Sequence, residues 1–147
     1  DVATLLNSGN VVFKAGKGTS ATLATDISKA IADRLGIEVP VIVKSAKDLD
    51  AIMADNPFAD TATDPSRLLV AFTPDAATLA NLDAIAPHLV APEQFLVGTH
   101  AAYLHCASGI LESKAAEAML GKAGKATTTR NWGTVQKLQA LVEKIGG

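Results

Sequence analysis

One uninterrupted apolar run constrains the fold of this chain more than any other segment. Residues 68–72 read Leu-Leu-Val-Ala-Phe and lie between Arg67 and Thr73. A strand with one face in water alternates apolar and polar residues, whereas a strand covered on both faces is apolar almost throughout. We therefore predict a strand over residues 67–73 that is covered on both of its faces.

Further strands are predicted on either side of this run. Residues 2–6 and 11–13 are apolar or β-branched and flank Asn7-Ser8-Gly9-Asn10, a pattern typical of a hairpin. Residues 94–97 and 101–106 predict a second hairpin that turns at Gly98-Thr99. Residues 39–43, Val-Pro-Val-Ile-Val, predict another strand, whose proline fits only near its start or on an edge.

The N-terminal half also contains two predicted helices. Apolar residues recur at helical spacing from Leu23 to Leu35, with caps expected at Thr19-Ser20 and at Gly36. A second helix is expected to begin after Ser45, which forms a capping-box pattern with Asp48, and to stop before Pro57.

Three more helices are predicted in the C-terminal half. Thr73-Pro74 suggests an N-cap followed by proline in the first helical position. Residues 111–120 predict a short Ala-rich helix ended by Gly121, and the last helix follows a possible cap at Thr128 or Thr129. Its apolar stripe is formed by Trp132, Val135, Leu138, Leu141, Val142 and Ile145.

Helices that alternate with strands, two of whose connections are hairpins, favour an α+β fold over a doubly wound parallel sheet. We predict two ferredoxin-like (alpha-beta plait) subdomains with mostly antiparallel sheets, helices on one face, and a C-terminal amphipathic helix. The polar segment 58–66 is the best internal boundary. The expected subdomains are therefore residues 1–60 and residues 61–147.

Composition excludes several classes of protein. The net charge is −2 and the sequence pI is about 5.9, which argues against general binding to nucleic acid or to membrane surfaces. Cys106 is the single cysteine, so no intrachain disulfide can form, and a cytoplasmic location is expected. No apolar run approaches the roughly 20 residues that span a bilayer. No cofactor is expected, and the sequence does not define the oligomeric state.

Most candidate catalytic or metal-binding motifs are weak. Residues 16–20, Gly-Lys-Gly-Thr-Ser, lie between a strand and a helix where phosphate could bind, but they lack the spacing of a P-loop. Ser113 and Lys114 are adjacent, so a helix points them about 100° apart, which does not suit a Ser–Lys catalytic pair. His100 and His105 alternate across a strand, and no zinc-binding spacing is present.

The strongest candidate is Arg130-Asn131-Trp132. Arg130 offers a planar fork for phosphate or carboxylate, Asn131 a donor and an acceptor, and Trp132 a stacking surface. The structural alternative is that Asn131 ties down a neighbouring loop and Trp132 anchors the last helix in the core. A buried Arg130 needs a partner, which is either a protein group or a ligand.

Several segments together resemble a bacterial family catalogued as domain of unknown function sixteen ninety-seven. Residues 7–13 resemble its tyr-x-gln-ser-gly-asn-val-x-phe hairpin, and residues 38–43 and 56–58 match its middle. Residues 128–132, Thr-Thr-Arg-Asn-Trp, resemble its C-terminal signature, and Ser113-Lys114 falls where the family has a ser-lys pair. The resemblance implies two alpha-beta plait subdomains and no known activity.

The chain departs from the family pattern in two respects. Family members begin with a strand and helix that include a leu-arg-gly-ile-asn-val-gly-gly segment, and this sequence lacks it. Asn7 replaces the usual Gln, and Gly133 stands where Asn is common. Because the opening strand of a ferredoxin-like sheet is central, we expect the first subdomain to lack its first strand and helix.

These observations lead to one main functional hypothesis and two alternatives. The main hypothesis is a binding module for a small anionic or nucleotide-like ligand. The alternatives are a metal-independent enzyme of unknown reaction and an RNA-binding plait module, which the acidic pI disfavours. The sequence does not decide whether the protein is an enzyme. The candidate ligand-binding residues occupy loops or helix starts, where sites usually lie: Ser8, Gly9, Asn10, Lys114, Arg130, Asn131 and Trp132.

Overall fold

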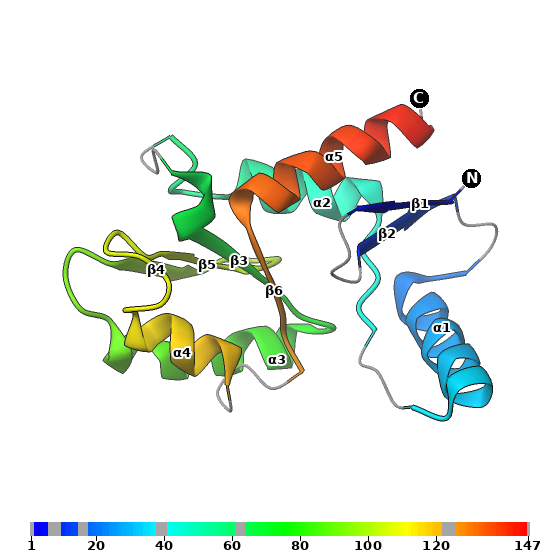
Figure 1. Ribbon diagram of the computed structural model, residues 1–147, viewed down its shortest axis with the longest axis horizontal. Helices are drawn as coiled ribbons and strands as arrows, with labels where there is room; N and C mark the ends of the chain where they lie inside the picture. Colours follow the sequence, from blue (N-terminus) through cyan, green and yellow to red (C-terminus); the bar gives the residue numbers. More distant parts are fainter. Residues whose placement is uncertain are drawn as a thin grey trace.

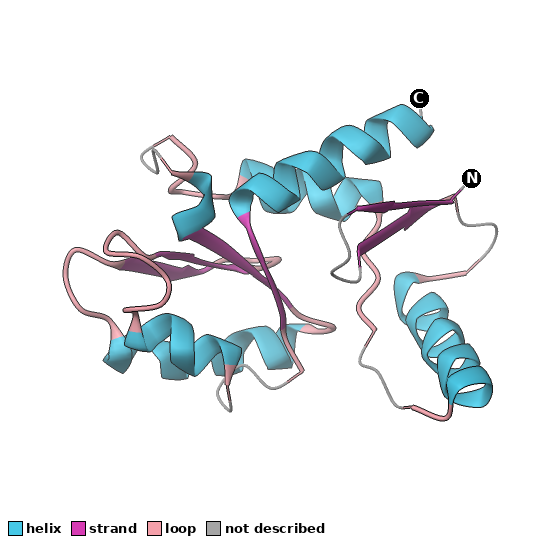
Figure 2. Cartoon of the chain, viewed as in Figure 1, coloured by secondary structure: helices cyan, strands magenta, loops and turns pink. Residues whose placement is uncertain are grey.

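The computed structural model describes residues 2–5, 10–14, 18–37, 41–60, 64–121 and 126–146. In this part of the chain, the strands form one four-stranded and one two-stranded sheet (Figures 1 and 2). The four-stranded sheet is antiparallel and has the order β4-β5-β3-β6. Its strands are β3 (Leu68–Phe72), β4 (Gln94–Val97), β5 (Ala102–His105) and β6 (Thr128–Asn131).

The prediction of a strand covered on both faces is confirmed by β3. All five of its residues are buried, and it lies between β5 and β6. Successive side chains of a strand point to opposite faces, so β3 contributes to two separate cores.

The face that lies below the sheet in Figure 1 packs on α3 (Ala76–Asn81), the 3₁₀ helix η2 (Leu82–His88) and α4 (Lys114–Leu120). We call the buried residues on this side the lower core. Its members are Leu69, Ala71, Leu79, Leu82, Ile85, Ala102, Leu104, Cys106, Ala115, Ala116 and Met119.

The opposite face packs on α2 (Ala46–Ala54) and on the start of α5 (Trp132–Gly146). The buried residues here form the upper core. Its members are Leu49, Ile52, Phe58, Leu68, Val70, Phe72, Ala101, Tyr103, Trp132 and Val135. The expectation that helices would cover one face of the sheet is therefore wrong for this sheet, because it has helices on both faces.

The predicted first hairpin is confirmed by β1 (Val2–Leu5) and β2 (Asn10–Phe13), which pair antiparallel with Leu5 opposite Asn10. The second hairpin is confirmed by β4 and β5. The strand predicted over residues 39–43 is not found in its described part, because residues 41–43 are not paired in a ladder. Residues 39 and 40 lie outside the described part.

Two predicted helices have the expected caps. In α1 (Ser20–Leu35), the Thr19 side chain accepts a hydrogen bond from the Thr22 N–H, and Gly36 closes the helix with φ at +67°. That left-handed conformation favours glycine. In α2, both hydrogen bonds of the Ser45–Asp48 capping box are formed.

Three helix starts differ from the prediction. The α3 N-cap is Asp75, not Thr73, because the Asp75 carboxylate accepts from the Thr78 N–H at 2.7 Å. Helix α4 begins at Lys114 rather than residue 111, with Ser113 as its cap. Thr128 and Thr129 do not cap the last helix, because residues 128–131 pair with β3 and form strand β6.

The chain is thus an α+β protein built around a four-stranded antiparallel sheet. The pair of ferredoxin-like subdomains and the boundary at residues 58–66 stay predictions.

Candidate functional site

Arg130 lies on β6, at the end of the sheet order, next to the small β1–β2 sheet. In the antiparallel register it stands opposite Val70, a member of the upper core. Residues directly opposite one another in such a pair project to the same face of the sheet. Arg130 therefore projects on the side of α2 and α5, and α5 in turn contacts both β1 and β2.

The guanidinium of Arg130 is oriented by two hydrogen bonds. Its Nε donates to Oδ1 of Asn10 at 2.7 Å, and its Nη1 donates to the carbonyl oxygen of Thr129 at 2.8 Å. Asn10 is 8% exposed and begins β2, so the first of these bonds joins the two sheets. Burial lowers the pKa of Arg130 from its usual value, because the charged form is desolvated.

The two residues that follow Arg130 have structural roles. The Asn131 Oδ1 accepts from the Thr134 N–H at 2.9 Å, so Asn131 caps α5. Trp132 is 6% exposed and belongs to the upper core. This burial leaves Trp132 without an open stacking surface, so the stacking interpretation of this residue is wrong.

Lys114 is separated from Arg130 by the four-stranded sheet. It begins α4, which packs on the lower core, whereas Arg130 projects on the upper-core side. Ser113 is buried and caps α4 by accepting from the Ala116 N–H at 3.0 Å, while Lys114 is exposed. The pair is therefore a helix cap followed by a solvated lysine.

The remaining candidates do not join this cluster in the described part of the chain. Ser8 and Gly9 lie outside the described residues, as do Gly16 and Lys17 of the glycine-rich turn. The glycine-rich turn's described end, Thr19, caps α1.

The Cys106 thiol is buried in the lower core, and desolvation raises its pKa. It is therefore a small buried hydrophobic residue rather than a reactive thiol. The ring of His105 stacks on Phe58 with centroids 6.5 Å apart. Among the residues that the structure describes, no group of three His, Cys, Asp or Glu side chains could hold a metal ion.

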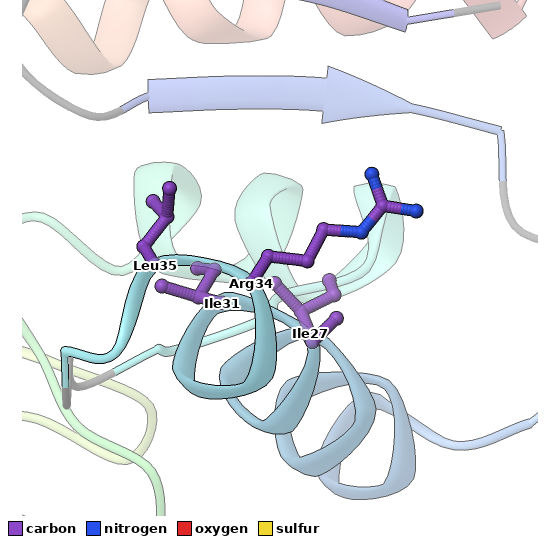
Figure 3. A pocket seen from close by; sticks show the side chains of 5 residues that line it. Ile27, Ile31, Arg34 and Leu35 are labelled. Carbon is purple, nitrogen blue, oxygen red and sulfur yellow. The ribbon is translucent and has the colours of Figure 1, made fainter.

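Two features were not anticipated from the sequence. The pairing of Arg130 with Asn10 joins residues at opposite ends of the chain, and no local pattern signals it. Apolar residues recur at helical spacing along α1, yet none of its residues is buried. Instead, Ile27, Ala30, Ile31, Arg34 and Leu35 line an open groove (Figure 3).

The protein is thus an α+β protein in which Arg130 of the four-stranded sheet bonds to Asn10 of the two-stranded sheet. Sequence comparison shows the family to which it belongs. Residues 1–103 match the family described as "Protein of unknown function (DUF1697)". The chain belongs to this family, as its hairpin motif at residues 7–13 indicated, while residues 128–132 lie outside the matched range. No curated protein matches the sequence.

A solved structure has a similar fold. It is described as conserved bacterial protein SP0830 from Streptococcus pneumoniae, with a TM-score of 0.76 and 18% sequence identity. The match covers 96% of this chain and 79% of that one. At this identity the likeness extends to the fold alone. In the described residues, no helix combines the length and apolar character that a membrane crossing requires.

Proposed function

We propose that this protein is a binding module whose ligand is a small anion, bound by Arg130 at the junction of β6, β2 and α5. The observation that carries the proposal is the hydrogen bond from Arg130 Nε to Asn10 Oδ1, because it fixes a partly buried guanidinium at the place where the two sheets meet.

The two oriented hydrogen bonds favour this reading of Arg130. The two acceptors are the amide oxygen of Asn10 and the backbone carbonyl oxygen of Thr129, so these bonds fix the orientation of the guanidinium plane. A preoriented planar fork loses little side-chain entropy when it binds a bidentate oxyanion. Partial burial strengthens such a contact because the local dielectric is lower than that of water.

The geometry also narrows the ligand class. Trp132 is buried, so base stacking is not part of the proposed site. Recognition would depend on the anionic group, either a phosphate or a carboxylate. Helices cover both faces of the four-stranded sheet, which argues against an RNA-binding module that displays aromatic residues on an open sheet face.

The test is titration calorimetry with inorganic phosphate, nucleoside monophosphates and small dicarboxylates, with thermal shift as a second readout. We expect at least one of these anions to bind, and Arg130→Ala to weaken that binding about tenfold or more. Arg130→Lys keeps the charge but loses the planar fork, so its affinity for the anion should lie between those of the parent protein and Arg130→Ala.

Two further variants separate binding from folding. Asn10→Ala leaves Arg130 in place but removes one orienting bond, and it should weaken binding by a smaller factor. Lys114→Ala removes one positive charge on the other side of the sheet and should bind like the parent protein. Equal binding by Arg130→Ala and the parent, or no binding of any anion, contradicts the proposal.

A further inference from the structure

The β2 strand is attached to the rest of the protein through a polar side chain. Asn10 is the one buried residue of β2, at 8% exposure, whereas Val11 is 53% exposed and Val12 and Phe13 are half-buried. Of the side chains that the structure describes, none from β2 belongs to the lower or the upper core or packs against either. The buried end of β2 is therefore an amide bonded to Arg130, not an apolar anchor.

Both cores are built without the β1–β2 sheet. Among the described residues, every member of the two cores lies at or after Leu49 in the chain. Separating β2 from Arg130 would therefore remove no residue from either core. A two-stranded sheet has little stability of its own in water, and elements of this kind open locally at a lower free energy than global unfolding requires.

From these observations we infer that the β1–β2 sheet opens independently of the four-stranded sheet, and that the Arg130–Asn10 hydrogen bond is the latch that keeps it closed. The bond joins a charged donor to a buried acceptor at 2.7 Å, which places it among the stronger hydrogen bonds. Because its two residues belong to different sheets, the bond exists only in the closed state.

The latch also regulates the anion site, and this part of the inference rests on the proposed function. In the closed state, Asn10 fixes the plane of the guanidinium that is proposed to bind the anion. Closure then raises the affinity of Arg130 for the anion. A bound anion must favour closure by the same factor, because the two equilibria share one thermodynamic cycle.

Hydrogen–deuterium exchange of the anion-free protein tests the latch, with the amides of β2 and β3 followed in the same sample. We expect β2 to exchange faster than β3 in the parent protein. Asn10→Ala should speed exchange in β2 about tenfold or more and leave β3 unchanged. Slow exchange in β3 also shows that the variant has kept both cores.

Two further variants make this test specific to the bond. Asn10→Ala combined with Arg130→Ala should exchange in β2 no faster than the faster single variant, because both substitutions remove the same bond. Thr19→Ala is the matched control. It also removes a side-chain hydrogen bond from the N-terminal part of the chain, but that bond caps α1, so exchange in β2 should not change.

The coupling is tested with the tightest-binding anion among inorganic phosphate, the nucleoside monophosphates and the dicarboxylates. At saturation, this anion should slow exchange in β2 of the parent protein about fivefold or more. In Asn10→Ala it should have no such effect, because the connection between Arg130 and β2 is lost.

The outcomes separate this inference from the proposed function. Equal exchange rates in β2 and β3 of the parent, or a β2 rate that Asn10→Ala leaves unchanged, overturn the latch. An anion that binds without slowing exchange in β2 overturns the coupling, while the proposed function stands. Absence of binding by any of the anions refutes the proposed function and the coupling together, and the anion-free exchange rates still decide the latch.

Discussion

The four-stranded sheet and the two-stranded sheet are stabilised in different ways. Every residue of β3 is buried, since the lower and upper cores cover its two faces. The two-stranded sheet is followed in the chain by α1, a helix of 16 residues of which none is buried. A two-stranded sheet has little independent stability in water, whereas a larger sheet covered by helices is stable.

The difference shows where the stability of the molecule resides. The small sheet is held by its contacts with α5 and by the Asn10–Arg130 hydrogen bond, not by a core of its own among the described residues. The candidate anion site lies at this junction, between the well-packed part and the sparsely packed part of the chain. Sites that must accept a ligand are often placed at such boundaries.

The two regions should differ most in how much a leucine-to-alanine substitution lowers the free energy of unfolding. Leu104→Ala removes a fully buried side chain of the lower core and should lower the free energy of unfolding by about 2–5 kcal/mol. Leu35→Ala removes an exposed side chain of α1 and should change it by about 0.5 kcal/mol or less. Urea denaturation in dilute solution measures both values, and similar losses would contradict the comparison.

Tyr103 in the upper core should make a smaller, pH-dependent contribution to the free energy of unfolding. Burial, with a lesser contribution from Asp55, raises its pKa from 10.0 to about 12. The folded state therefore holds this proton more tightly than the unfolded state does. The resulting stability is fully present below about pH 10 and is lost as pH rises to about 12, by up to roughly 2–3 kcal/mol.

The titration of Tyr103 can be read directly, because it is the only tyrosine in the chain. Its phenol donates to the carbonyl oxygen of Ile52 at 2.6 Å, linking β5 to α2. We expect the ultraviolet absorbance of tyrosinate to appear only near pH 12, together with unfolding. Tyr103→Phe should reduce the alkaline loss of stability, and a tyrosinate titration midpoint near pH 10 in the folded protein would refute the expectation.

The smallest difference is expected between two helix caps. Asn131→Ala removes the side chain that caps α5 and should lower the free energy of unfolding by about 1 kcal/mol, because α5 anchors the upper core. Thr19→Ala removes the corresponding cap of α1 and should lower global stability less, since α1 contributes no buried residue. Chemical denaturation of the two variants measures both losses of unfolding free energy. A larger loss for Thr19→Ala than for Asn131→Ala would contradict the prediction.

The elements whose signals are local could be predicted from the sequence. The run at residues 68–72, both hairpins, and the caps at Thr19, Ser45 and Gly36 all follow from short patterns and are found in the structure. Each of these depends on neighbouring residues or on a strongly apolar composition, so the rest of the chain does not override it.

The errors arise where distant segments decide the outcome. Residues 128–131 carry two potential threonine caps, but pairing with β3 makes them a strand. Residues 41–43 are β-branched or apolar but have no ladder partner in the described chain. The candidate site could not be predicted for the same reason. Arg130 and Lys114 lie on opposite sides of the four-stranded sheet, and only the pairing of distant strands determines this.

The placement of the two optically active side chains also has a practical consequence. The single tryptophan, Trp132, and the single tyrosine, Tyr103, both belong to the upper core. Intrinsic fluorescence will therefore report on the α2 and α5 side of the sheet, while loosening of the α3 and α4 side leaves the emission almost unchanged. Any unfolding curve recorded by fluorescence alone would follow one layer of the molecule, and circular dichroism is needed to observe the other.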